Sequence, residues 1–193
     1  EVKQKFDKVE QQLRTCLPAE MKDKPNWVIV RTRENADTGR LDKFLISPVT
    51  GKFAESDNPE TWTDFDTACK YARGNGGVAL AYALDGKDGI ACIDLDHCVG
   101  EDGKRSALAD EVLSKCGKTY IESSVSGKGI HVFGKTDGMD LRSFSKDGDM
   151  EFYQDNHFIA MTGDGAGYYN LESFDTPEMK SLLERKLERR TEW

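Results

Sequence analysis

The sequence predicts an α+β fold whose sheets are mostly antiparallel. The elements expected along the chain run α–β–β–α–β–β–α–β–β–β–β–α, so strands follow one another directly more often than they alternate with helices. Short turns rich in glycine, asparagine and aspartate separate several of these strands, as at residues 33–40, and such turns join antiparallel neighbours. The 193 residues, 37% hydrophobic and 32% charged, suffice for one domain, or for one domain with a small lobe.

The first half of the chain contributes two helices and three strands. We expect a helix over residues 2–17, strands at 26–33, 42–47 and 78–83, and a second helix from 63 to about 72. The first two strands form a hairpin around the turn at 33–40. Thr63 is expected to cap the second helix, with Asp66 at the reciprocal position of a capping box.

The second half is richer in strands. We expect strands at residues 90–96, 118–123, 130–135, 150–153 and 157–162, and helices at 106–116 and 177–190. The short turn at 85–89 predicts a hairpin between the strands at 78–83 and 90–96. The polar residues 137–148 are expected to form a loop.

Charge and cysteine content restrict the function classes. A net charge of −8 argues against a protein that holds duplex DNA through a broadly basic surface, but it leaves room for local basic grooves. Five cysteines at irregular spacing indicate the reduced thiols of a cytoplasmic protein. No segment predicts a signal peptide or a membrane span. Because the sequence begins at Glu1 and ends in a charged helical run, we expect a domain of a longer protein.

Two aspartates on one expected strand are the first candidate site. Side chains alternate along a strand, so Asp94 and Asp96 share one face with Cys92, and their Cα atoms lie roughly 6–7 Å apart. Both carboxylates can therefore reach one hard cation. The alternative is a strand end with two solvated acids. A zinc site formed by Cys92, His97 and Cys98 is a weaker alternative, since no Cys-x-x-Cys pair is present.

A glycine-bearing loop is the second candidate. Gly127 and Gly129 permit close backbone approach, so successive N–H groups can line an anion, and Ser126 and Lys128 add a hydroxyl and a cation. On the following strand, His131 lies opposite the core-facing side. The loop is either a phosphate cradle with an imidazole donor or an ordinary hairpin with a surface histidine. It lacks the spacing of a Walker loop.

Glu151 is the third candidate. It lies mid-strand between Met150 and Phe152, which face the core. The glutamate is either an edge-strand charge or a third oxygen ligand. With Asp94 and Asp96 it would suit two Mg²⁺ or Mn²⁺ ions about 3.5–4 Å apart, the arrangement used for phosphoryl transfer.

These motifs, in this order, resemble the archaeo-eukaryotic primase superfamily, in particular the primase–polymerase domains of phages, plasmids and other mobile elements. The matching segments are Ile-Asp-Leu-Asp-His-Cys at 93–98, Glu-Ser-Ser-Val-Ser-Gly-Lys-Gly-Ile-His at 122–131, Glu-Phe-Tyr at 151–153 with Thr-Gly at 162–163, and, upstream, Trp27, 43–51 and Asn-Pro-Glu-Thr-Trp at 58–62. The resemblance covers about residues 25–175.

The resemblance implies a two-lobed catalytic core. A helix over residues 1–20 would precede a catalytic domain at 21–193, in which an N-terminal α/β lobe at about 21–85 stands beside a palm at about 86–175. The palm would be related to the RNA-recognition fold. The remaining residues, 176–193, would form a C-terminal helix.

The resemblance also implies roles for individual residues. Asp94, Asp96 and Glu151 would hold two divalent metals, whereas Ser126, Gly127, Lys128, Gly129 and His131 would bind the phosphates of a nucleoside triphosphate. Lys43 is carried over as a cation on the nucleotide side. Arg142 and Lys146 are candidate template or phosphate contacts, although a solvated surface loop is the favoured account of this pair.

The implied activity is that of a template-dependent nucleotidyltransferase, a DNA primase or polymerase acting on single-stranded template. Relatives suggest a helicase or a zinc-stem region in the full-length protein. Two alternatives remain open, a non-catalytic nucleotide- or nucleic-acid-binding accessory domain and a metal-dependent nuclease.

Overall fold

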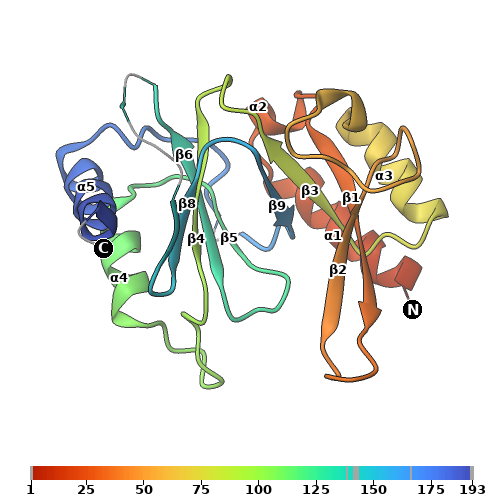
Figure 1. Ribbon diagram of the computed structural model, residues 1–193, viewed down its shortest axis with the longest axis horizontal. Coiled ribbons are helices and arrows are strands. Elements are labelled where there is room, and N and C mark those ends of the chain that lie inside the picture. Colours follow the sequence, from red (N-terminus) through yellow and green to blue (C-terminus); the bar gives the residue numbers. More distant parts are fainter. Residues whose placement is uncertain (1, 138, 141–143, 166, 192–193) are drawn as a thin grey trace. The chain divides into compact units, whose positions relative to one another are not determined.

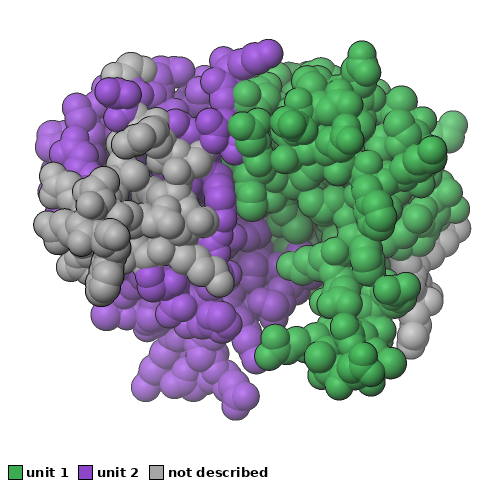
Figure 2. Space-filling model, in the orientation of Figure 1, with its two compact units in different colours: residues 1–85, 156–164 green, residues 86–155, 165–193 purple. Residues whose placement is uncertain are grey.

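Two compact units make up the chain. The computed structural model describes residues 2–137, 139–140, 144–165 and 167–191 (Figure 1). Unit 1 comprises residues 1–85 and 156–164, and unit 2 comprises residues 86–155 and 165–193 (Figure 2). Each unit has one sheet whose strands pair in antiparallel fashion, with helices packed on it, so the predicted α+β class is confirmed.

Unit 1 is built on a four-stranded sheet with the strand order β2-β1-β3-β9 (Figure 1). Its elements are α1 (Val2–Cys16), α2 (Ala19–Lys22), β1 (Trp27–Glu34), β2 (Leu41–Ile46), the 3-10 helix η1 (Pro59–Thr61), α3 (Phe65–Gly74), β3 (Ala79–Leu84) and β9 (His157–Met161). Trp27 anchors one face of the sheet, because its ring meets the rings of Phe65 and Tyr82 edge-on and its indole N–H donates to the Met21 carbonyl.

The cap of α3 differs from the prediction. Asp64, and not Thr63, is the N-cap, and its carboxylate accepts from the Thr67 N–H at 3.0 Å and from the Thr67 hydroxyl at 2.6 Å. The Thr63 backbone instead pairs with that of Trp27. A carboxylate offers more acceptor sites than a hydroxyl, so a neighbouring aspartate can take the cap from the threonine.

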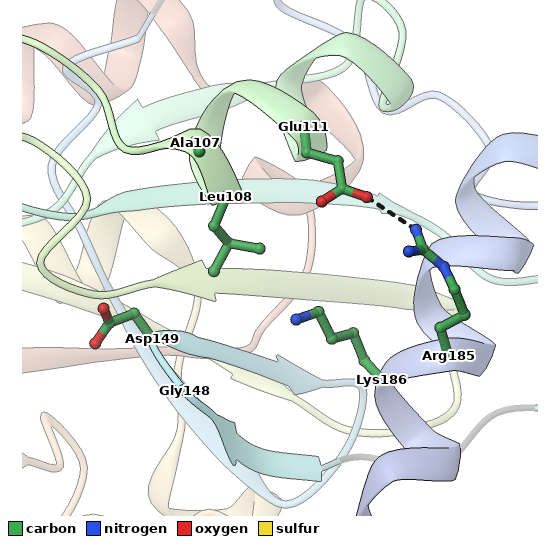
Figure 3. Close-up of a pocket in the computed structure, with 7 residues that line it drawn as sticks. All are labelled: Ala107, Leu108, Glu111, Gly148, Asp149, Arg185 and Lys186. Atoms are coloured by element: carbon green, nitrogen blue, oxygen red, sulfur yellow. Dashed lines mark hydrogen bonds and ion pairs between the residues drawn. The ribbon is translucent and has the colours of Figure 1, made fainter.

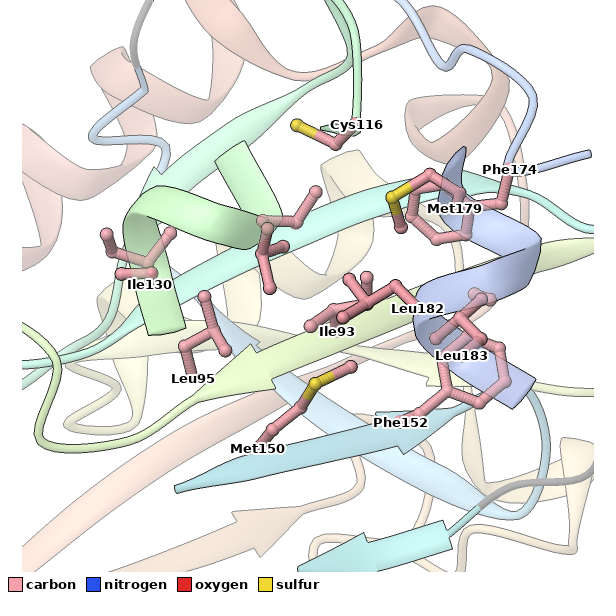
Figure 4. Close-up of a cluster of buried hydrophobic side chains, with 14 of the residues drawn as sticks. Ile93, Leu95, Cys116, Ile130, Met150, Phe152, Phe174, Met179, Leu182 and Leu183 are labelled. Atoms are coloured by element: carbon pink, nitrogen blue, oxygen red, sulfur yellow. The ribbon is translucent and has the colours of Figure 1, made fainter. Parts of the chain in front are cut away.

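Unit 2 is built on a five-stranded sheet with the order β5-β6-β4-β8-β7. Its elements are β4 (Ile90–Leu95), α4 (Ala107–Lys115), β5 (Ile121–Ser123), β6 (Ile130–Lys135), β7 (Phe144–Asp147), β8 (Met150–Tyr153) and α5 (Pro177–Thr191). Alternate residues of the three central strands pack against the helices, as Figure 4 shows for Ile93 and Phe152, which lie beside Leu182 of α5. The predicted core-facing residues of these strands are confirmed, and the other face is left for polar side chains.

One strand pairing was predicted wrongly, and one strand was predicted as a loop. Strands β3 and β4 do not form a hairpin, because β3 pairs with β1 and β9, whereas β4 pairs with β6 and β8. Every residue of β3 and most of β4 is buried, as in a central strand that needs a partner on both edges. The residues between them, including Gly86 and Gly89 at positive φ, lead the chain from one sheet to the other. Strand β7 lies inside the segment predicted as a loop.

Neither a disulfide bond nor a membrane-spanning helix occurs among the described residues. All five cysteines are free thiols. Among the helices of the described residues, none combines the length and the apolar character needed to cross a membrane.

Candidate active site

The face of β4 that points away from the helices forms the centre of the candidate site. Asp94 lies directly opposite His131 of β6 on one side and directly opposite Glu151 of β8 on the other. Side chains that are directly opposite in an antiparallel sheet have Cβ atoms about 4.5–5.5 Å apart. The three sequence motifs therefore lie on adjacent strands of one sheet, with Asp94 in the middle.

Asp96 extends this acidic row just beyond the end of β4. Its backbone N–H donates to the Asp149 carbonyl at 2.8 Å, which continues the pairing with the segment that leads into β8. Burial, the negative charge of Asp94 and a hydrogen bond to Glu151 raise the pKa of the Asp96 carboxyl. A raised pKa means that the folded protein disfavours the ionised form, as expected where carboxylates crowd together.

Tyr153, on the same strand, contacts the Glu151 side chain. Its hydroxyl donates to the Glu151 carboxylate, and burial together with this hydrogen bond raises the pKa of the phenol. The tyrosine follows Glu151 by two residues and so shares its face of β8. Glu151 is thus held by hydrogen bonds and is not a freely solvated edge charge.

His131 is nearly buried, with 6% of its surface exposed. Its Nδ1 lies 3.0 Å from Oε2 of Glu122, and its Nε2 lies 3.5 Å from Oδ1 of Asp94. The hydroxyl of Tyr120 donates to Oε1 of Glu122 at 2.8 Å. A polar chain therefore runs from Tyr120 through Glu122 and His131 to Asp94.

The sequence reasoning gave no role to Tyr120 or Glu122. One signal was available for the glutamate, because it lies between Ile121 and Ser123 on a strand next to that of His131. An acid at such a position shares a face with the histidine if the two strands pair in register. Glu122 is in fact directly opposite His131.

The glycine-bearing loop is held by its own hydrogen bonds. The N–H of Gly127 donates to the Ser124 carbonyl at 2.9 Å, that of Lys128 to the Ser126 hydroxyl at 3.2 Å, and that of Gly129 to the Ser124 hydroxyl at 2.9 Å. Gly127 has a positive φ of 74°. A Cβ atom on Gly129 would lie 2.7 Å from the Leu95 carbonyl oxygen, so this position requires glycine.

These hydrogen bonds compete with the predicted binding of a phosphate by the backbone of the loop. The three N–H groups already donate within the loop, so a phosphate would have to replace some of these bonds. The side chains of Ser126 and Lys128 lie at the exposed tip. The loop is attached to the end of β4, because the Lys128 carbonyl accepts from the N–H groups of Cys98 and Val99.

Other predicted residues lie elsewhere. Lys43 is an exposed residue of β2 in unit 1, whereas the remaining site residues belong to unit 2. Arg142 lies outside the described residues, and of Lys146 only the backbone, in β7, is described. Cys92 is fully buried, and the thiol of Cys98 donates to the Leu95 carbonyl at 3.5 Å.

The three acids are ligand types that divalent metals prefer, but their side chains do not converge as the ligands of a metal site do. Three carboxylates are the hard oxygen ligands that Mg²⁺ and Mn²⁺ prefer. In the described part of the chain, however, no three His, Cys, Asp or Glu side chains converge as a metal site requires. A cation bound among these acids would offset the burial and the like charges that raise the pKa of the Asp96 carboxyl, and the acids could then turn toward it.

A separate pocket of about 390 Å³ lies in unit 2 between α4, α5 and the turn before β8 (Figure 3). Its lining residues are Ala107, Leu108, Glu111, Gly148, Asp149, Arg185 and Lys186. Arg185 donates to Glu111 at 2.8 Å across it. None of the three candidate acids lines this pocket.

Comparison with known proteins bears on the class. No family model matches the sequence. The chain is 30% identical over 167 residues to the DNA primase-polymerase of Nitratiruptor phage NrS-1, a match that includes 84% of this chain. The resemblance to primase–polymerase domains that the motifs carry is thereby confirmed. The chain spans 22% of the length of that phage protein.

Proposed function

We propose that the protein is a template-dependent nucleotidyltransferase, a DNA primase or DNA polymerase. The observation that carries this proposal is the row of His131, Asp94 and Glu151 across three adjacent strands, with Asp96 beside it. Acids that would bind metal and a histidine that would bind phosphate thus occur on one face of one sheet. The similarity to a phage DNA primase-polymerase supports the same activity.

The acids would act through two divalent ions. Asp94, Asp96 and Glu151 would hold Mg²⁺ or Mn²⁺, which when bound lower the pKa of the attacking hydroxyl and neutralise the triphosphate. Tyr153 would orient Glu151 through its hydrogen bond. Because the acids repel one another without cations, metal binding is expected to precede or accompany nucleotide binding.

The histidine and the loop would hold the nucleotide. Nε2 of His131 faces Asp94, so in the imidazolium form it can donate to a phosphate oxygen of a nucleotide whose phosphates lie at the acids. Ser126 and Lys128 at the exposed loop tip would contact the same phosphates, and the backbone from Gly127 to Gly129 would adapt around them.

The wider protein is expected to follow the same pattern. Unit 2 would be the palm, related to the RNA-recognition fold, and unit 1 the N-terminal lobe of a two-lobed core. The partners would be nucleoside triphosphates and a single-stranded DNA template, with a helicase or zinc-stem region elsewhere in the full-length protein. The protein would act in the cytoplasm, and its gene would belong to a phage, a plasmid or another mobile element.

Incubation with labelled deoxynucleotides, Mn²⁺ and a primed or unprimed template tests the proposal. Longer products support the polymerase or primase, shorter ones indicate the nuclease, and unchanged template indicates the accessory domain. Asp94→Asn should remove the activity. Asp102→Asn, which changes an exposed loop acid in the same way, should retain it.

A further inference from the structure

Glu122 is an unusual residue for the interior of a domain. Only 1% of its surface is exposed, and no part of its side chain is. Removing a carboxylate from water is costly, and an apolar residue of similar size often gives a more stable protein. A requirement of packing alone would therefore not select a glutamate here.

Both oxygens of this carboxylate have a defined partner. Oε1 accepts from the Tyr120 hydroxyl at 2.8 Å, and Oε2 lies 3.0 Å from Nδ1 of His131. Tyr120 is itself fully buried. The carboxylate is thus fixed on one side by a rigid aromatic residue and holds the imidazole on the other.

The geometry determines where the opposite nitrogen of the ring points. With Nδ1 held by Glu122, Nε2 is directed at Asp94, whose Oδ1 lies 3.5 Å away. The ring of Phe133 meets the imidazole edge-on, with 6.4 Å between ring centroids and 85° between the planes. The imidazole therefore has little freedom to rotate.

We propose that Glu122, supported by Tyr120, is a positioning residue for His131. It holds the imidazole with Nε2 directed at the row of acids, where the phosphates of the nucleotide would lie. This inference rests on the proposed function. A carboxylate that holds the far nitrogen of a functional histidine recurs in metal sites, and its loss there lowers affinity or activity about 10- to 100-fold.

Equilibrium binding of dATP with Mn²⁺ to the whole chain, followed by calorimetry, tests the proposal. Glu122→Ala should weaken binding about 10-fold. Glu122→Gln should restore much of this loss, because an amide oxygen can still accept from Nδ1–H. Tyr120→Phe, which removes one hydroxyl and keeps the ring, should give a smaller loss. Glu111→Ala, which removes an ion-paired carboxylate from α4, should bind as the wild type does.

A double-mutant cycle separates positioning from support of the fold. In a His131→Ala background, Glu122→Ala should have no further effect on dATP binding, because the group that it positions is absent. An equal loss in both backgrounds would overturn the proposal and leave Glu122 as a structural residue. If Glu122→Ala fails to fold, the same cycle with Tyr120→Phe replaces it.

A spectroscopic measurement addresses the histidine without nucleotide. The protein has three histidines, so the ring nitrogens of His131 can be assigned in a long-range ¹H–¹⁵N spectrum by their loss in His131→Ala. The wild type should keep a fixed, slowly exchanging proton on Nδ1, whether or not Nε2 is also protonated, and Glu122→Ala should lose this proton or exchange it rapidly with water. An unchanged spectrum would overturn the inference. Failure of the wild type to bind dATP would instead reject the proposed function.

Discussion

Neutralising one acid of the crowded row should stabilise the metal-free protein. In Asp96→Asn the side chain keeps its size and loses its negative charge. The neighbouring negative charges of Asp94 and Glu151 disfavour that charge in the wild type. Two like charges about 6.5 Å apart repel by about 2–3 kcal/mol at an effective dielectric constant of about 20. Asp96 is half-buried, and screening by solvent and salt reduces the net gain to about 0.5–1 kcal/mol.

The sign of the pH dependence follows from the raised pKa of Asp96. Below the unfolded-state pKa of about 3.9 the carboxyl is protonated in both states, so aspartate and asparagine are equivalent. As the pH rises through the higher folded-state pKa, the wild type loses stability that the asparagine variant keeps. The advantage of Asp96→Asn should therefore be present at pH 7.5 and small only below about pH 3.5, under the unfolded-state pKa.

Thermal unfolding in EDTA, followed by circular dichroism, measures this difference. A gain of 0.5–1 kcal/mol corresponds to a rise of about 1–4 °C in Tm for a chain of this size. Added Mn²⁺ should raise the Tm of the wild type and much less that of the variant, because the variant lacks one ligand. Asp102→Asn is the control and should respond to Mn²⁺ as the wild type does. A variant less stable than the wild type at pH 7.5 would refute the reasoning.

Four further outcomes are expected. Asp94→Ala should abolish nucleotide transfer in a primer-extension assay with the Tm unchanged or higher, and retained extension would remove Asp94 from the metal ligands. His131→Ala should lower the efficiency of nucleotide use about 10- to 100-fold, as expected for a charge-assisted hydrogen bond of about 1.5–3 kcal/mol, and an unfolded variant would make it a core residue. Fluorescence polarisation should give a Kd for single-stranded DNA of about 10⁻⁴–10⁻⁶ M at physiological salt, tightened by Mn²⁺ and nucleotide; tight binding without them would contradict the charge argument. Gly134→Ala should destabilise unit 2 by about 1–3 kcal/mol in denaturant unfolding, because its Cβ would overlap the Phe174 ring, and no change would mean that the ring moves easily.

The sequence predicted which face of a strand each residue occupies better than it predicted which strands pair with one another. Alternation in β4 placed Asp94 opposite the core correctly, because a period of two is a local property of the chain. Which strands pair is a property of the whole sheet. The fully buried pattern of β3 fits either sheet, and nothing local in His157–Met161 indicates that this strand pairs with β3.

The same limit applies to the site. The residue types at Asp94, Glu151 and His131 were apparent from their motifs, but the contact between His131 and Glu122 depends on the register of β5 and β6. The loop at 124–129 was predicted to offer N–H groups to an anion. In the structure these groups donate within the loop, a competition that residue types alone do not reveal.

The return of the chain to the first sheet affects how the protein can be made. When residues 1–85 have left the ribosome, one edge of β3 still lacks its partner, since β9 is synthesised only after most of unit 2. An exposed strand edge of this kind is prone to pair with other chains. We therefore expect the first sheet to be completed late, and fragments that end before residue 157 to aggregate or to recruit chaperones. Neither unit can be excised as a single continuous segment, so the two depend on one translation product for their assembly.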